Sequence, residues 1–504
     1  MSSAVGFPLP SHRKGLVTPV VLVVLLIAYG VILFRNLSYA AGGPDTSGYM
    51  NLAKLLASGR TRYVIEPIRM LGLVPTETLV SIFTPLGFTW GIEGTGTMAP
   101  GYQPGLPLHL VAAASIGGWN RAPFFVSPIA ALLSVVMMFR IGREFGLSPF
   151  LSGVGAATLG LLPQLVWHAL QPASDVVATL WSLVAIWCAL KALEKPSFAV
   201  AAGVAFAISV WVRPTGILLG LPLALAFRLR PKLLLRGILG ALPFAVALML
   251  YQRAVYGSAF KTAYGTAGDV VSAAHLLLSL RIFSRWLFLI CGPLIFPTGL
   301  IVAVDRRVPI WHRLLLPVWF GVFLGFYCLW GPYDDLGSLR FLLPGTPALI
   351  LGTLLFVQTV FDKYATTTWF RVWRGGMGLG LAILIGWPAY QLHHYKIWDM
   401  AGMESVYPEA VLWAERQLPP NALVVSGSLS GAFFYYSGRF SARADQLDTS
   451  SFQQIRAYAA RRGLRWYAVL SDGEPEFRSL GKKLPGRWTL LGTYRNVAMW
   501  RLDS

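Results

Sequence analysis

Charged residues are scarce in this chain of 504 residues: Asp, Glu, Lys and Arg make up 13% of it, whereas 55% is hydrophobic. A soluble chain carries about twice that share of charge, so the composition excludes a soluble globular protein and indicates a polytopic membrane protein. Acidic residues are the scarcer kind, 22 against 42 Lys and Arg, which gives a formal net charge of +20. In a soluble protein that excess would suggest nucleic acid, but in a membrane protein it first concerns orientation, and we expect no nucleic-acid partner.

Cysteine is rare as well. Cys188, Cys291 and Cys328 lie inside apolar runs without CxxC spacing, so they indicate neither a zinc site nor a disulfide framework, and we expect core positions. The sequence has no Gly-rich phosphate loop, which excludes the usual site for a soluble nucleotide sugar. We expect no cofactor, and no pattern of ligands points to a metal ion.

Apolar runs of membrane-spanning length are what the chain has in abundance. The first follows a basic start and lacks a small-residue cleavage pattern, so we expect an uncleaved first helix. A shorter run at 104–118 begins with Pro-Gly and is left out of the count. The eleven predicted spans are about 16–34, 122–139, 148–169, 175–193, 198–212, 214–229, 234–252, 285–304, 313–330, 341–361 and 375–391.

Basic residues fall unevenly between these runs. With eleven spans and the N-terminus inside, the predicted cytoplasmic loops hold 16 Lys and Arg residues, as the positive-inside rule requires. The outer segments are then a long first loop (35–121), a loop near 254–284, the turn 331–340 and everything after about 392. This last part reads as strand–helix, helix–strand and a hairpin. We therefore predict a membrane domain (1–391) in the cell's inner membrane and a small extracytoplasmic α/β domain (392–504).

The first loop opens with "GPDTSGYMNLAKLLASG", residues 43–59. Asp45 is a preferred N-cap residue and Gly59 a typical helix stop, so the stretch predicts a short helix. Its apolar residues share one face, which predicts that the helix lies flat on the membrane. From these residues alone, Asp45 as a mere cap and Asp45 as a functional carboxylate are equally supported.

Further motifs follow in order: "MAPGYQPGLPLHL", "RAPFFVSPIAALLSVVMMFRIGREFG", "LLPQLVWHALQPASDVVATLW", "VWVRPTGILLGLP", "AVYGSAFKTAYG" and "GSLRFLLPGTPALIL". Across residues 10–391 the sequence resembles the membrane glycosyltransferases of the GT-C type, which include protein O-mannosyltransferases, the lipid A aminoarabinose transferase and oligosaccharyltransferases. The resemblance implies a first outer loop with two surface helices, the second at 104–118. It implies transfer of a sugar from a polyprenyl phosphate or diphosphate, with inversion and with Asp45 as catalytic base. Many relatives place a second acidic residue directly after this aspartate, whereas this chain has Thr46.

Sugar transfer from a phosphate needs a base for the acceptor and cations for the leaving group, rather than a second carboxylic acid. Arg suits phosphate because its donors match the phosphate oxygens. The basic candidates at the outer ends of spans are Arg213, Arg253, Lys261, Arg281, Arg285 and Arg340, with Tyr264 beside them. For Arg281 and Arg285, snorkelling to lipid headgroups is an equal alternative.

Other polar residues of the outer side are assigned to substrate contact or to structure. Tyr49, Tyr102, Gln103, His109 and Asp175 are expected to line the sugar or acceptor space, although N-capping of the helix 175–193 is the favoured role of Asp175. His168 and His109 lack the spacing of a metal site and can equally be structural. Asp334 and Asp335 read as a solvated turn. Glu66, Glu77 and Glu93 remain open as the second carboxylate.

The sequence thus supports an inverting glycosyltransferase that uses a polyprenyl-phosphate sugar and a glycan, lipid or protein acceptor, with the lipid tail in a groove near 198–229 and 285–330. A transporter or flippase of lipid-linked sugars is the alternative, since the polytopic body suits it equally. It would not need the long first loop, and its usual marks, broken helices in matched halves and ionisable groups at mid-membrane, are not clear. A third class is an assembly protein that presents the C-terminal domain.

Overall fold

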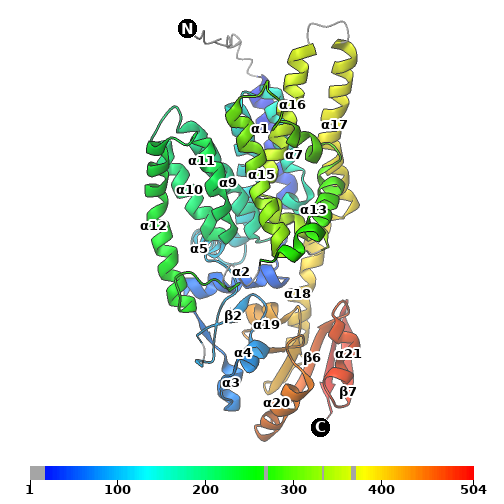
Figure 1. Cartoon of the computed structure of the whole chain (residues 1–504). Coiled ribbons are helices and arrows are strands. Elements are labelled where there is room, and N and C mark those ends of the chain that lie inside the picture. Colours follow the sequence, from blue (N-terminus) through cyan, green and yellow to red (C-terminus); the bar gives the residue numbers. More distant parts are fainter. Residues whose placement is uncertain (1–16, 93, 266–270, 332–333, 365–369, 504) are drawn as a thin grey trace.

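Figure 1 shows the computed structural model, which describes residues 17–92, 94–265, 271–331, 334–364 and 370–503. Long helices form a bundle that makes up the upper part of the molecule. The helix α2 (Pro44–Ala57) lies across the lower end of this bundle, and the C-terminal sheet lies below α2. The chain is therefore built as a helical bundle and an α/β layer with α2 between them.

Five helical segments of the described chain are long and apolar enough to cross a membrane, and two bent pairs raise this number to seven. The long segments are η1 with α6 (Ala122–Phe125, Val126–Glu144), α9 (Ser174–Lys191), α12 (Pro231–Tyr256), η4 with α13 (Ala273–His275, Leu276–Cys291) and α15 (Ile310–Trp330). The bent pairs are α7 (Pro149–Gly160) with α8 (Pro163–Ala169), at 60°, and η5 (Leu336–Leu342) with α16 (Thr346–Tyr364), at 78°. The remaining helices of the bundle are α1 (Val17–Arg35), α5 (Gly105–Gly117), α10 (Phe198–Val212), η2 (Pro214–Leu219), α11 (Gly220–Ala226), α14 (Ile295–Ile301) and α17 (Phe370–His394).

Each of the eleven apolar segments predicted from the sequence contains helix, but the boundaries differ in places. The segment 285–304 crosses a break at Gly292, whose φ of +97° lies in the region that glycine adopts more readily than other residues. The helix α13 begins nine residues before the predicted start and ends at this break, and a separate helix, α14, follows. In 148–169 the helix breaks before Pro163, because proline has no N–H for the helical ladder. The number of spans stays a prediction.

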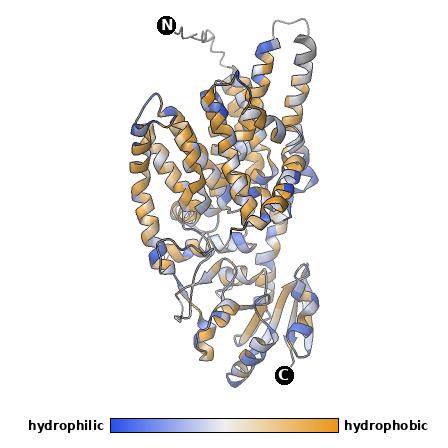
Figure 2. Ribbon diagram, viewed as in Figure 1, coloured by the Kyte–Doolittle hydropathy of each residue, from blue (hydrophilic) through white to orange (hydrophobic). Residues whose placement is uncertain are grey.

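The outside of the bundle is apolar, as Figure 2 shows. On α12, for example, Leu235, Ile238, Leu242 and Leu250 each expose half or more of their surface. Such a continuous exposed apolar face is unstable in water and is matched by lipid tails. The chain is a multi-pass membrane protein.

The first outer segment folds into short elements around α2. Its strands β1 (Tyr63–Val64), β2 (Phe88–Trp90) and β3 (Thr97–Pro100) form an antiparallel sheet in the order β1-β3-β2, and its other helices are α3 (Glu66–Leu71) and α4 (Glu77–Phe83). The predicted helix at 104–118 is α5. The prediction that Asp45 caps α2 is wrong: Gly43 is the N-cap, Pro44 starts the helix, and Asp45 lies in the first turn. Gly59, at φ +69°, follows the end of the helix as predicted.

The C-terminal part is the predicted α/β unit. After η6 (Ile397–Asp399) and α18 (Met400–Glu415), the elements are β4 (Ala422–Ser426), α19 (Ser430–Ser437), β5 (Ser441–Arg443), α20 (Thr449–Arg461), β6 (Arg465–Ser471), α21 (Pro475–Lys483), β7 (Trp488–Tyr494) and β8 (Val497–Leu502). The sheet has the order β5-β4-β6-β8-β7, with β4 parallel to both of its neighbours and β8 antiparallel to β6 and β7. The end of β4 therefore lies in the middle of the parallel half.

One hydrophobic core joins the first loop to this C-terminal sheet. Leu52 and Leu55 of α2, together with Phe83 of α4, are fully buried and belong to the same cluster as Val425 of β4 and Phe452 of α20. Each such side chain contributes about 1.5–3 kcal/mol when fully buried. The helix α2 is thus buried on two sides, against the bundle and against the C-terminal sheet, and not on one face as its apolar pattern predicted. That it lies flat on the membrane stays a prediction.

Candidate active site

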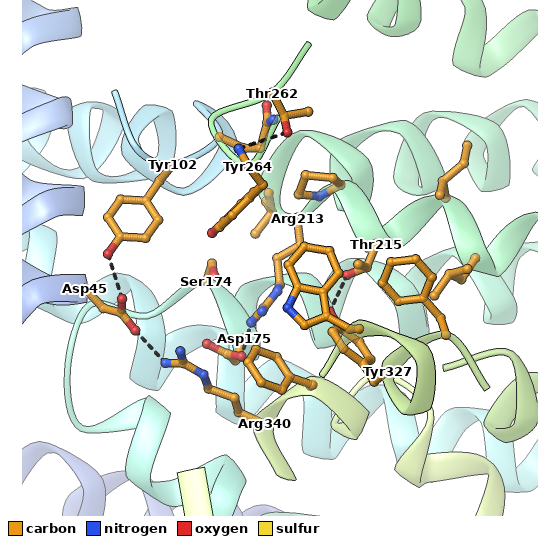
Figure 3. Close-up of a pocket in the computed structure, with 18 of the residues that line it drawn as sticks. Asp45, Tyr102, Ser174, Asp175, Arg213, Thr215, Thr262, Tyr264, Tyr327 and Arg340 are labelled. Atoms are coloured by element: carbon orange, nitrogen blue, oxygen red, sulfur yellow. Dashed lines mark hydrogen bonds and ion pairs between the residues drawn. The ribbon is translucent and has the colours of Figure 1, made fainter. Parts of the chain in front are cut away.

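A cavity of about 700 Å³ opens where α2 meets the bundle. Its walls come from α2, the N-terminal end of α9, the turn before η2, the loop after α12, the last turn of α15 and η5. Figure 3 shows the polar side chains that point into it. Of the predicted site residues, the cavity brings together Asp45, Tyr49, Tyr102, Gln103, Asp175, Arg213, Tyr264 and Arg340.

Asp45 stands at the mouth of this arrangement, in the first turn of α2. Its Oδ1 accepts a hydrogen bond from the Tyr102 hydroxyl at 2.7 Å, and its Oδ2 forms an ion pair with Arg340 at 2.5 Å. Its side chain is 41% exposed, into the cavity. Burial opposes ionisation, but the Arg340 guanidinium and the Tyr102 hydroxyl outweigh it and hold the pKa of Asp45 below its ordinary value. Asp45 is therefore an ionised carboxylate with both oxygens engaged.

A second, deeper ion pair joins Asp175 to Arg213. The Asp175 side chain is only 4% exposed, and Nδ1 of His168 lies 4.0 Å from its other oxygen. The favoured prediction that Asp175 caps its helix is wrong: Ala173 is the N-cap, α9 begins at Ser174, and the carboxylate turns to Arg213, 38 residues further on. A tertiary charge pair has replaced a local cap.

The two arginines face the same aromatic ring. Phe341 lies 5.1 Å from the Arg340 guanidinium and 5.5 Å from that of Arg213, and it stacks on Tyr327 at 4.8 Å. The Tyr327 hydroxyl donates to Thr215 at 2.9 Å. Two guanidiniums held on an aromatic platform present converging N–H donors, which is an arrangement suited to phosphate oxygens.

Tyrosines and one amide form the opposite wall. The Tyr49 hydroxyl is 2.7 Å from Ser174 Oγ, and its ring lies 4.3 Å from that of Tyr102. Gln103 is 4% exposed, lines the cavity, and has no hydrogen-bond partner within the described protein for either amide atom. A buried amide without partners costs about 1–3 kcal/mol per group.

Three predicted residues lie outside the cavity. Arg253 is exposed on the last turn of α12, and Lys261 is exposed although its neighbours Phe260 and Thr262 line the wall. His109 is engaged in structure: its ring nitrogens contact the Gly105 carbonyl at 2.7 Å and Trp181 Nε1 at 3.1 Å.

The remaining acidic and basic candidates are also apart from the cavity, except for Asp335. Arg285 pairs with Asp334, and these two line a separate hollow of about 290 Å³ with Arg281. Glu66 pairs with Arg69 at 2.8 Å, Glu77 is exposed, and Glu93 lies outside the described residues. Asp335 lines the cavity but caps η5 by accepting from Ser338 N at 2.8 Å.

Sequence reasoning missed several cavity residues, namely Ser174, Thr215, Thr262, Phe326, Tyr327, Trp330 and Phe341. Most of them belong to apolar helices or stand beside residues that were singled out. Their only available signal was position: apart from Thr262, which lies in the loop after the span 234–252, each lies within a few residues of a predicted outer end of a span.

Metal binding does not suit these residues as they stand. Of the three aspartates that line the cavity, Asp45 and Asp175 have an arginine partner and Asp335 caps η5. The described part of the chain holds no group of three or more His, Cys, Asp or Glu side chains that could bind a metal ion. Hard divalent cations need several free oxygen ligands. We derive no step through a metal.

Known proteins were compared with the chain at the levels of sequence and structure. Neither protein-family models nor curated proteins match its sequence. Solved structures do match: ArnT from Cupriavidus metallidurans in the apo state has a TM-score of 0.57 at 14% identity, covering 96% of this chain and 98% of ArnT. ArnT bound to undecaprenyl phosphate gives 0.54 at 15% identity, covering 95% and 97%.

The oligosaccharyltransferase AglB from Archaeoglobus fulgidus, in complex with an inhibitory peptide and a dolichol-phosphate, gives a TM-score of 0.57 at 12% identity, covering 97% of this chain and 75% of AglB. The likeness to ArnT extends over nearly the whole of both chains, the C-terminal domain included. The chain therefore has the GT-C fold that its motifs predict.

Proposed function

We propose that this protein is a glycosyltransferase that moves a sugar from a polyprenyl-phosphate carrier to an acceptor on the outer face of the membrane. The observation that carries the proposal is the ionised Asp45 beside Arg340, in a cavity that holds a second arginine, Arg213. The likeness to ArnT bound to undecaprenyl phosphate and to AglB bound to dolichol-phosphate supports a carrier of the same class.

The reaction assigns one task to each group. Asp45 takes the proton of an acceptor hydroxyl or amine, the acceptor atom bonds to the anomeric carbon, and the bond from that carbon to the phosphate oxygen breaks. The electron pair leaves with the phosphate, which Arg213 and Arg340 stabilise. A single displacement inverts the anomeric centre. No carboxylic acid is needed at the leaving group, because phosphate is already a stable anion.

The pair between Asp45 and Arg340 links donor binding to base strength. While Arg340 contacts Asp45, it holds the pKa of that carboxyl low and occupies one of its oxygens. A donor phosphate competes for the same guanidinium. Its arrival weakens the ion pair, raises the pKa of Asp45 and frees an oxygen for the acceptor. The base is thus strengthened when the donor is bound.

Sugar contacts are assigned to the opposite wall. Gln103, Tyr49 and Tyr102 line this wall, and their amide, hydroxyl and aromatic groups are of the kinds that bind sugars. The acceptor belongs to the same broad classes as in the sequence-based hypothesis: glycan, lipid or protein. The cytoplasmic N-terminus and extracytoplasmic C-terminal domain belong to this proposal too. The transporter alternative is less well supported: two helix pairs are bent, but the cavity with its ionised side chains opens between α2 and the bundle, and Figure 1 shows α2 at the end of the bundle and not midway along it.

The test compares lipid and glycan mass profiles of the source organism with the gene deleted, restored, or restored as Asp45→Asn. Loss of the base lowers transfer by about 10²–10⁴-fold, so the deletion and Asp45→Asn strains should both lack one sugar increment. The exposed aspartate Asp472 supplies the matched control, Asp472→Asn, which should restore the increment. Full restoration by Asp45→Asn at equal membrane abundance would contradict the proposal.

A further inference from the structure

The C-terminal domain holds the N-terminal end of α2 through a residue far away in the sequence. Glu404 of α18 accepts a hydrogen bond at 2.9 Å from the backbone N–H of Gly43, the N-cap of α2. Asp45 is two residues further along. No side chain of the described chain caps α2 in the usual way. The negative carboxylate also faces the positive end of the helix dipole, which favours this placement.

The bond from Glu404 takes the place of one that α2 does not make for itself. In a capping box the third residue of the helix is Glu or Gln and reaches back to the N-cap N–H. In α2 that position is Thr46, which donates instead to Gln171 at 3.0 Å. Glu404 therefore makes, from a distant part of the same chain, the contact that a Glu at position 46 would make within the helix.

Packing around this contact leaves Glu404 little freedom. A Cβ on Gly42 would clash with the Glu404 carboxylate and lie 3.1 Å from its backbone oxygen, so a side chain at position 42 would displace the carboxylate from its contact. Immediately before, the Ala41 N–H donates to the Tyr436 hydroxyl at 2.8 Å. Burial raises the pKa of the Glu404 carboxyl, the hydrogen bond from Gly43 opposes the rise, and the charge of Asp45 adds to it.

The same domain grips α2 further along its length. Asn51 Nδ2 donates to the Gly431 carbonyl at 3.0 Å, and Lys54 Nζ donates to the Tyr435 carbonyl at 3.2 Å. Gly431 is the second residue of α19, the helix that follows β4, and a Cβ there would clash with the Ser47 hydroxyl. In open α/β sheets the loop at the end of such a central parallel strand is where ligands bind. Here α2 packs on the helix that follows that loop, α19.

We propose that the C-terminal domain is a clamp for the helix that carries Asp45, and that Glu404 is its positioning residue, fixing the first turn of α2 for transfer. The inference rests on the proposed function. Glu404 does not line the cavity, so it acts through the position of Asp45 and not on the substrate. Displacing a reacting group by about 1 Å can cost about 100-fold in rate.

The test uses full-length variants in vesicles of the deletion strain at matched abundance, with the product increment measured as an initial rate. Glu404→Ala should slow transfer by about tenfold to 100-fold. Glu404→Gln should recover most of the rate, because its amide oxygen can accept the same N–H. The affinity of the purified protein for undecaprenyl phosphate should change by less than about twofold, since Arg213 and Arg340 are untouched.

Glu409→Ala is the matched control. Glu409 lies on the same helix but bonds Tyr494 at 2.8 Å and Arg495 at 2.9 Å, within the C-terminal domain, and its loss should leave the rate unchanged. If Glu404→Ala does not accumulate, Tyr436→Phe carries the test, because it removes only the oxygen that holds Ala41, and it should slow transfer.

The clamp is overturned if Glu404→Ala transfers at the wild-type rate, or if Glu404→Ala and Glu404→Gln lose the same share of the transfer rate. Where Glu404→Ala does not accumulate, an unchanged transfer rate in Tyr436→Phe overturns it. A weakened affinity for undecaprenyl phosphate would also overturn it, because the effect would then lie in donor binding. Absence of product from the wild-type chain is a different result and counts against the proposed function itself.

Discussion

Removing Arg213 should destabilise this protein far more than removing the charge of its partner. In the wild type the Asp175 side chain is 4% exposed and that of Arg213 16% exposed, and the two form an ion pair. Arg213→Met leaves Asp175 as a buried charge whose nearest remaining cation is His168, at 4.0 Å and only when protonated. Breaking a buried pair in this way costs about 3–5 kcal/mol of unfolding free energy.

The opposite change is milder. Asp175→Asn keeps the shape and one oxygen for Arg213, whose guanidinium borders the cavity, so the expected cost is about 1–3 kcal/mol. The double variant Arg213→Met/Asp175→Asn leaves a neutral buried amide in place of a charge, at a similar cost of about 1–3 kcal/mol. It should therefore be more stable than Arg213→Met alone by roughly 2 kcal/mol, although it carries one more substitution.

Chemical unfolding in detergent micelles, followed by tryptophan fluorescence, measures all three variants on one scale. The decisive comparison is between Arg213→Met and the double variant, because transfer activity does not enter it. If the second substitution adds to the loss instead of restoring stability, Asp175 is not an ionised partner of Arg213 and the charge arrangement of the cavity is wrong.

Three further predictions concern the cavity. Arg340→Met removes the cation that lowers the pKa of Asp45, so the acid limb of the pH profile of kcat/KM should move to higher pH. The pH profile of Arg340→Lys should stay near that of the wild type. Coincident pH profiles of Arg340→Met and the wild type would contradict this prediction. Gln103→Leu should raise the unfolding free energy by up to about 1–3 kcal/mol, because it removes a buried amide that has no hydrogen-bond partner in the described chain. A loss of stability would show that the amide has a partner. Gly48→Ala should cost about 1–3 kcal/mol, because its Cβ would lie 2.7 Å from the Gly87 Cα, and a neutral effect in the unfolding assay would show that this contact is loose.

Much of the fold follows from the sequence because apolar length and charge asymmetry are local properties. The predicted apolar segments are all helical, and the strand–helix pattern after 392 is confirmed, since period and turn residues suffice for both. Where helices break, as before Pro163 and at Gly292, the residues that cause it were visible, but their effect depends on the neighbouring helices. The hydrophobic pattern of α2 was also visible, yet its second partner, the C-terminal sheet, is hundreds of residues away.

Some residues of the site could likewise be predicted from the sequence, and others could not. Asp45, Arg213 and Arg340 could be singled out because each is a polar residue at the outer end of an apolar run, where charge is disfavoured without a function. Lys261 shared that signal, but in an irregular loop no period says which side chains point inward, and the structure directs it away from the cavity. Glu404 gave no signal at all, because its contact with Gly43 joins residues 361 apart.

The charges of the cavity explain why one aspartate and two arginines suffice for the proposed reaction. Without substrate, the pairs of Asp45 with Arg340 and of Asp175 with Arg213 leave no net charge. The donor is a phosphodiester with a single negative charge, and the polyprenyl phosphate that leaves carries about −1.5 to −2. The proton that Asp45 takes from the acceptor cancels the charge of its own carboxylate as the phosphate gains one. The total is conserved, and protonation of Asp45 completes the release of Arg340 that donor binding began, so the guanidinium is fully available to the phosphate as it gains its second charge.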